Sequence, residues 1–205
     1  APYLALMSQS GGTVTANGIQ FGGDSGTYDS ASSAVLQLGG GSLYVGAQGI
    51  TRGSAAGELA VAIRLQGGTL GADQNWSSSL DMQLGNAGGG VSIRAQDSGG
   101  TGRNIILSGN LSDDGEVNGS LTKSGIADLI LSGANNTYSG GTTINAGRLF
   151  ISNAGALPPT GTVLVNAGTL DFNASGSPVF DQNILLAPGA RLAVRKAATL
   201  TNVSL

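Results

Sequence analysis

Residues 121–149 read LTKSGIADLILSGANNTYSGGTTINAGRL, in which three short apolar runs stand between clusters of glycine, asparagine, serine and threonine. Turn-forming residues that return every few positions cannot sustain a helix for three turns, and they are typical of the corners between short β-strands. Leu129 and Leu131 alternate with Asp128 and Ile130, which gives the strand they form an apolar face. The stretch therefore predicts one unit of a repeating β structure.

The unit is repeated further along the chain. The segment TTINAGRLFIS at 142–152 aligns with TVLVNAGTLDF at 162–172, and LLAPGARLAV at 185–194 continues the series. Gly147, Gly168 and Gly189 follow one another at equal intervals of about 21 residues. A period in the low twenties is typical of a solenoid, and about 20 residues supply three short faces and three corners. The spacing predicts an all-β parallel β-helix with roughly 20–22 residues per coil.

The repeat is regular in only part of the chain. We expect one domain over residues 1–205, with irregular coils over 1–119, regular coils over 120–194 and a terminal strand over 195–205. In the irregular part, an Asn17-Gly18 turn and the glycines at 39–41 mark corners between short apolar runs.

The amino-acid composition argues against several classes of protein. The 36 glycines and 40% hydrophobic residues indicate a folded chain rich in turns, and a net charge of −3 is too small for a disordered one. Nine basic residues spread over the chain form no stripe that could neutralise phosphates, so we expect no nucleic-acid partner. No apolar run approaches the length of roughly 18 residues typical of a membrane-spanning helix, so none is predicted, and the sequence suggests no cofactor.

Residues 121–149 also resemble a known family, the passenger-associated transport repeat, or autotransporter-associated β-strand repeat, of bacterial secreted proteins. The residues that carry the resemblance are Leu121-Thr122-Lys123, Gly125, Leu129, Leu131-Ser132-Gly133-Ala134-Asn135, Thr137-Tyr138, Gly140-Gly141-Thr142-Thr143 and Asn145-Ala146-Gly147. The resemblance implies a right-handed parallel β-helix located outside the cell or on its surface, and no catalytic residue, because the motif is structural. The chain departs from the pattern at Ile126-Ala127-Asp128 and at Ile130, where members usually have small or polar residues.

Two sets of residues are predicted to build the coil. The alternating positions of the regular coils should form the core: Leu129, Leu131, Leu149, Ile151, Val163, Val165, Leu170, Phe172, Leu192 and Val194. Asn145 and Asn166 occupy the same corner one coil apart, followed by Gly147, Gly168 and Gly189. An asparagine can adopt a left-handed conformation and bond to its equivalents above and below, so we expect a structural ladder there.

The acidic residues are candidates for metal binding or catalysis. Asp113, Asp114 and Glu116 lie within four residues, but their spacing matches no known calcium loop and favours a solvated turn over a metal site. Enzymes that cleave acidic polysaccharides need clustered carboxylates, whereas Asp128, Asp171 and Asp181 stand apart in the sequence. We therefore expect no enzyme. The rings of Tyr138 and Trp76 are expected to fill corners rather than to bind sugars.

Apolar residues at outward positions suggest a partner. Strand parity places Ile106, Ile130, Leu164 and Leu185 outward, and Tyr44 and Phe150 take the corresponding place on the strands that follow a glycine corner. Both ends of the chain read as apolar strands, with Leu4, Leu6, Leu200 and Leu205, and no charged residue precedes position 24 or follows position 196. Because an open solenoid end exposes backbone groups and core, these ends are predicted to form interfaces.

Three functional hypotheses follow from these patterns. The leading one is a non-catalytic extracellular structural protein that associates with itself, end to end, into a fibre or surface array. The second is a fragment of a longer autotransporter-type passenger stalk or adhesin, which the start at Ala1-Pro2 in place of Met also indicates. The third is a glycan-binding or glycan-cleaving β-helix, which requires carboxylates and aromatic rings gathered in a groove.

Overall fold

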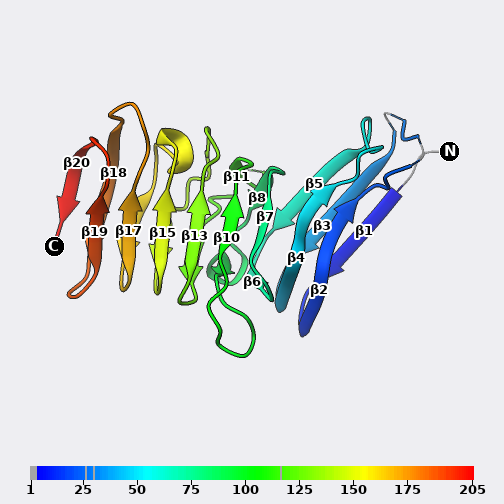
Figure 1. The fold of residues 1–205 in the computed structure, drawn as a ribbon, viewed down its shortest axis with the longest axis horizontal. Coiled ribbons are helices and arrows are strands. Elements are labelled where there is room, and N and C mark those ends of the chain that lie inside the picture. The colour runs from blue at the N-terminus through cyan, green and yellow to red at the C-terminus, as the bar shows by residue number, and fades with distance from the viewer. Residues whose placement is uncertain (1–3, 26, 30, 116) are drawn as a thin grey trace.

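The computed structural model describes residues 4–25, 27–29, 31–115 and 117–205. Within them the chain is almost entirely β structure, and the only helical segments are two short 3₁₀ turns, η1 (Ala87–Gly89) and η2 (Ala154–Ala156). The strands stack along one long axis, with β1 and β20 near its opposite ends (Figure 1). The chain therefore forms an elongated rod in which each coil meets only its neighbours.

Three parallel sheets form the sides of the rod. The nine-stranded sheet runs along its whole length and contains, in order, β2 (Thr13–Phe21), β4 (Ser42–Arg52), β6 (Gly68–Ala72), β9 (Val91–Arg94), β12 (Leu121–Ser124), β14 (Thr142–Ile144), β16 (Thr162–Val165), β18 (Val179–Leu186) and β20 (Thr199–Ser204). The five-stranded sheet covers the first part of the rod with β1 (Leu4–Gln9), β3 (Ser33–Leu38), β5 (Ala60–Leu65), β8 (Met82–Leu84) and β11 (Leu111–Asp113).

The six-stranded sheet covers the later part with β7 (Trp76–Ser78), β10 (Ile105–Leu107), β13 (Asp128–Leu131), β15 (Arg148–Ile151), β17 (Thr169–Phe172) and β19 (Arg191–Val194). Every strand pair in the three sheets is parallel, and neighbouring strands are separated by a full coil of the chain. This confirms the predicted parallel β-helix.

The strand register gives the length of each coil. Asp128 pairs with Arg148, Arg148 with Thr169, and Thr169 with Arg191, so each of these coils contains roughly 20–22 residues, the length typical of a short solenoid repeat. In the first coil, by contrast, Leu4 pairs with Ser33, which makes that coil longer than any of these three. In the earlier part the spacing between register partners varies more, from 19 residues between Arg64 and Gln83 to 30 between Val91 and Leu121.

The core is a column of apolar side chains enclosed by the sheets. Of the predicted core residues, eight are fully or almost fully buried: Leu129, Leu131, Leu149, Ile151, Val163, Val165, Leu170 and Phe172. Leu192 is only partly buried, and Val194 is 46% exposed, so the prediction of a buried Val194 is wrong. Val194 pairs with buried Phe172 and faces the same way, but β19 is the last described strand of its sheet and nothing described covers it.

Glycines, rather than asparagines, make the left-handed corners. Gly147, Gly168 and Gly189 have φ of +65°, +86° and +85°, and Ser177 is the only described non-glycine residue with positive φ. Asn145 and Asn166 are therefore not left-handed, contrary to the conformation expected for them. They do bond to each other, since Asn166 Nδ2 donates to Asn145 Oδ1 at 2.9 Å.

Buried polar groups close the third side beyond β11, where residues 132–141 form no strand. The side chain of Asn136 bridges three coils, because its Oδ1 accepts from the Leu111 N–H at 2.8 Å and its Nδ2 donates to the Ala156 carbonyl at 2.7 Å. Tyr138 is fully buried with its hydroxyl 2.6 Å from Thr142 Oγ1. The side chain of Asn136 thus links neighbouring coils by hydrogen bonds, as the backbone of a strand does on the other sides of the rod.

Candidate functional site

The outer face of the six-stranded sheet carries an apolar column. Ile106, Ile130 and Phe150 are register partners on β10, β13 and β15, and all three side chains are at least partly exposed. The column begins beside Ser77 on β7 and stops at Asp171 on β17. The structure therefore brings three of the predicted outward residues together, over three consecutive coils.

The other predicted outward residues lie elsewhere. Leu164 and Leu185 are neighbours on the outer face of the nine-stranded sheet, where both are half-buried. Tyr44 is only 5% exposed, so its prediction as an interface residue is wrong. The ring of Tyr44 lies over Gly71 of the next coil. Any residue with a side chain at position 71 would place its Cβ atom 2.5 Å from this ring, so the glycine is what leaves room for the tyrosine.

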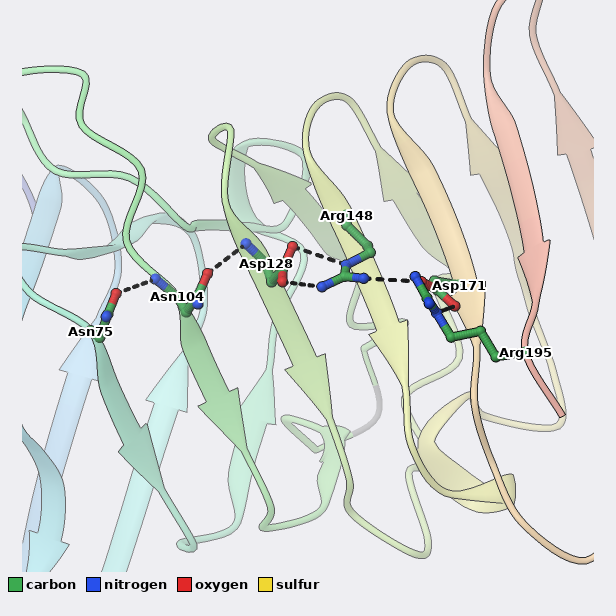
Figure 2. A network of polar contacts seen from close by, with 6 residues as sticks. All are labelled: Asn75, Asn104, Asp128, Arg148, Asp171 and Arg195. Carbon is green, nitrogen blue, oxygen red and sulfur yellow. Dashed lines mark hydrogen bonds and ion pairs between the residues drawn. The ribbon is translucent and has the colours of Figure 1, made fainter.

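A ladder of polar side chains crosses the six-stranded sheet (Figure 2), at the starts of the strands from β7 to β15 and near the ends of β17 and β19. Asn75 Oδ1 accepts from the Asn104 N–H at 2.8 Å, and Asn104 Oδ1 accepts from the Asp128 N–H at 3.0 Å. Arg148 then donates from Nε to Asp128 Oδ1 at 3.0 Å and makes a second bond to the same carboxylate through Nη2. Each coil is thereby tied to the next by a side chain as well as by its strands.

The ladder continues to a buried carboxylate, that of Asp171, and ends at Arg195. Asp171 has no exposed surface and accepts from Arg148 Nη1 at 3.2 Å and from Arg195 Nε at 2.9 and 2.8 Å. Arg148 also lies over the ring of Phe150, with Cζ 5.2 Å from the ring centroid. The hydrogen bonds to Asp128, followed by the one to Asp171, raise the pKa of Arg148 above its ordinary value, which already keeps the guanidinium charged.

Asp128 and Asp171, which were expected to stand apart, are joined by this ladder through Arg148. The residues that form its charged part, at 128, 148, 171 and 195, alternate in sign, but their spacings of 20, 23 and 24 follow no single period. An alternation of acidic and basic residues at intervals close to one coil was the signal that could have revealed them.

Removing the carboxylate of Asp171 should weaken the rod. We expect Asp171→Ala to lower the free energy of unfolding by about 2 to 3 kcal/mol, because Arg148 and Arg195 lose their shared partner, although both reach solvent and relax part of the cost. The matched control is Asp181→Ala, which removes an exposed carboxylate bonded to Thr201 and should cost less than about 0.5 kcal/mol. Urea unfolding followed by circular dichroism measures both, and equal losses would contradict the role given to Asp171.

The described acidic side chains at the corner between β11 and β12 accept hydrogen bonds from neighbouring residues. Asp113 accepts from the N–H groups of Gly119 and Ser139 at 2.7 and 3.0 Å, and from Ser139 Oγ at 2.7 Å. Asp114 accepts from Gln66 Nε2 at 2.7 Å. Glu116, the third residue of the weak metal candidate, lies outside the described residues. Elsewhere in the described ranges, no three acidic side chains gather closely enough to hold a metal ion.

Of the three carboxylates that could serve in catalysis, those of Asp128 and Asp171 are bonded to arginines and that of Asp181 lies on another sheet. Asp128 and Asp171 are bridged by Arg148, whereas Asp181 lies on β18 and accepts from Thr201. Both carboxylate oxygens of Asp128 accept from Arg148 and both of Asp171 accept from Arg195, so these groups are occupied by arginines rather than free to meet a substrate. No described helix has the length and apolar character needed to cross a membrane.

The apolar core is open at both ends of the described rod. At the first coil, Val14 faces inward and is 38% exposed, while its register partner Leu43 is fully buried. An apolar hollow of about 240 Å³ opens there between β1, β2 and β3, lined mainly by Ala5, Leu6, Met7, Ile19, Phe21, Ala34 and Val35. At the last coil, Val203 is 40% exposed although its partner Ile184 is fully buried.

The predicted end residues differ in how they lie, since Ala5 and Met7, and not Leu4 and Leu6, are the residues of β1 that pack on the core. Leu4 and Leu6 are largely exposed on β1, and Leu205 is fully exposed. Leu200 is partly buried against the core and so offers less surface than expected.

The comparisons with known proteins agree with the regular part of the rod. Residues 121–149 match the model of the passenger-associated-transport-repeat family. No curated protein and no solved structure matches the chain. The matched stretch begins with β12, includes β13 and β14 and ends in β15, where the coils become short and regular. The chain therefore carries one passenger-associated transport repeat, which spans one complete coil of its β-helix and the start of the next.

Proposed function

We propose that the chain is a non-catalytic structural rod, secreted by or displayed on a bacterium, that associates with itself through the two open ends of its β-helix. The repeat at 121–149 supports the location, because passenger-associated repeats suggest a secreted or cell-surface protein. The open core supports the association. Val14 and Val203 face inward and are 38% and 40% exposed, whereas their register partners one coil further in, Leu43 and Ile184, are fully buried.

The ends offer more than the lateral faces do. Burying three outward side chains, Ile106, Ile130 and Phe150, would contribute about 4 to 9 kcal/mol, whereas association costs roughly 4 to 15 kcal/mol. This column alone therefore supports at most a weak contact, and Tyr44 does not add to it. An end offers apolar core together with the unpaired N–H and C=O groups of an edge strand, which template the addition of another strand.

Light scattering at increasing protein concentration tests the proposal. We expect the mean mass to rise with concentration and electron microscopy to show rods longer than one chain. Val203→Asp should abolish this rise, because it places a charge in the open core at the last coil. The matched control is Ser204→Asp on the same strand, which points away from the core and should associate like the unmodified protein.

Circular dichroism separates loss of association from loss of fold. Val203→Asp should retain the β spectrum of the unmodified protein, because the residue lies in the last strand and is already 40% exposed. If the unmodified chain remains a monomer at all concentrations tested, association through the ends is refuted.

A second candidate is favoured by the match to the passenger repeat. In that case the chain is a segment of a longer autotransporter-type passenger stalk or adhesin, and the coils that cover its ends belong to the same polypeptide. Mass spectrometry of the native protein distinguishes the two, since a polypeptide much heavier than 20.1 kDa supports the segment. A glycan-binding or glycan-cleaving role has less support, because Asp128 and Asp171 are both held by arginines.

A further inference from the structure

We infer that the rods join head to tail, so that the β19 and β20 end of one copy docks on the β1 and β2 end of the next and the opposite charges of the two ends select this direction. This inference rests on the proposed association through the ends. It adds the orientation of the partner, the register of the junction and its dependence on salt.

The first end of the rod is acidic. Asp24 and Asp29 are the only charged residues before Arg52, and both lie in the connection between β2 and β3. Neither forms an ion pair with a described residue. The Ser54 N–H, followed by the Gln20 side chain, lowers the pKa of Asp24, so its carboxylate is ionised at neutral pH.

The opposite end is basic. The only charged residues after Asp181 are Arg191 and Arg195 in and after β19 and Lys196 before β20. Arg195 is paired with Asp171, but Arg191 is exposed and makes no ion pair with a described residue, and Lys196 donates to the Ser175 hydroxyl. Within the described part of the chain, Arg191 and Lys196 thus form no ion pair with a carboxylate, and Asp24 and Asp29 form none with a cation.

Charge and strand direction favour the same junction. Joining two basic ends brings Arg191 and Lys196 against their own copies, and joining two acidic ends does the same with Asp24 and Asp29, so both symmetric junctions are repulsive. The nine-stranded sheet has β2 at one edge and β20 at the other. Only a head-to-tail junction places β20 beside β2 in the parallel direction that every other pair in the sheet has.

The register of the sheet predicts which residues meet. Thr13 and Ser204 belong to one outward column, which passes through Ser42, Thr69, Ser92, Thr122, Thr143, Leu164 and Leu185. If the junction continues this register, Ser204 of one copy lies beside Thr13 of the next, at the spacing of about 4.8 Å between neighbouring strands. That spacing allows a disulfide between cysteines at the two positions.

Disulfide formation between single-cysteine variants tests the orientation. The chain has no cysteine, so Thr13→Cys and Ser204→Cys each introduce one thiol, on exposed outward positions. We expect mild oxidation of an equal mixture of the two variants to give several-fold more covalent dimer than oxidation of either variant alone. Dimer formed as readily by Ser204→Cys alone or by Thr13→Cys alone would overturn the head-to-tail junction.

Added salt and charge reversal test whether the charges of the two ends select the head-to-tail junction. Raising the salt from about 50 mM to about 500 mM should lower the dimer yield of the mixture several-fold, because the junction depends on exposed charges. Arg191→Glu, introduced into Ser204→Cys, should lower the yield similarly at low salt, whereas Arg103→Glu, in the middle of the rod, should not. A yield unaffected by salt and by Arg191→Glu would refute selection by charge. Light scattering of the unmodified chain reports association itself, so failure of the proposed function is seen separately.

Discussion

Replacing Gly147 with alanine should lower the free energy of unfolding by about 3 to 5 kcal/mol. Two costs add. Gly147 has a φ of +65°, which an L side chain rarely adopts, and a Cβ atom there would lie 2.5 Å from the Gly125 carbonyl oxygen and 2.6 Å from that of Ala127. Because both oxygens belong to the backbone of the preceding coil, neither can move without disturbing the stack.

Gly189→Ala is the matched control for this substitution. Gly189 occupies the equivalent corner two coils later and has a φ of +85°, but a Cβ atom there meets nothing within 4 Å. The backbone conformation alone should therefore cost about 1 kcal/mol. Urea unfolding followed by circular dichroism measures both variants. Equal losses would show that close stacking of the corners contributes nothing.

Lys123→Met should also be strongly destabilising, by about 2 to 4 kcal/mol at pH 7. Lys123 is fully buried on β12, in register with Ile144 on one side and Ile93 on the other. Its Nζ donates to three carbonyl oxygens at the corner: those of Ser124 at 2.7 Å, Gly125 at 2.6 Å and Ala146 at 2.9 Å. Methionine fills the space but removes the ammonium donor from all three carbonyls, of which only that of Ser124 also accepts from a described backbone N–H, that of Ala95 at 3.0 Å.

Lys196→Met is the control for Lys123→Met. Lys196 is exposed and its ammonium donates only to the Ser175 hydroxyl, so its loss should change stability by less than about 0.5 kcal/mol. If Lys123→Met were no more destabilising than Lys196→Met, the three carbonyl bonds would contribute nothing net.

The same lysine makes stability depend on pH. Burial lowers the pKa of Lys123 from 10.5 to about 8, against the opposing effect of the Asp128 charge. Between these two values the unfolded chain binds more protons than the folded one, so the free energy of unfolding rises with pH across this window and is unaffected by this group below it. We expect a gain of about 2 to 3 kcal/mol between pH 7.5 and pH 10, at about 1.4 kcal/mol per pH unit. Lys123→Met should lack this gain, and an equal rise in both proteins would refute the assignment.

The coil could be predicted from residues 121–149 because its determinants are local. Alternation of Leu129 and Leu131 with Asp128 and Ile130 sets which side chains face the core, and the glycine at 147 makes the corner. The alternation and the positive φ of the corner are local properties of the chain, whereas the close fit of Gly147 against the preceding coil is not. The resemblance to the passenger repeat rests on these same residues, and the family match confirms it over that stretch.

The candidate sites were less predictable because they depend on contacts between coils. Strand parity correctly places Tyr44 on the outer side of its strand, but only the neighbouring coil shows that Gly71 leaves room for the ring to be buried. The buried position of Lys123 was also missed, because its ammonium is satisfied by backbone carbonyls, which carry no signal in the sequence.

The sequence by itself determined that the chain winds into a parallel β-helix, since the alternation along each strand and the even spacing of the corner glycines are properties of the chain alone. Only the tertiary structure decided which side chains stand beside one another, because that depends on connections of unequal length. The ladder from Asp128 through Arg148 and Asp171 to Arg195 joins residues 20, 23 and 24 positions apart, and stacking alone brings them into contact. Open ends were predicted from the uncharged apolar strands at 4–6 and 200–205, but which inward side chain is exposed there is seen only when Val203 is compared with buried Ile184 one coil earlier.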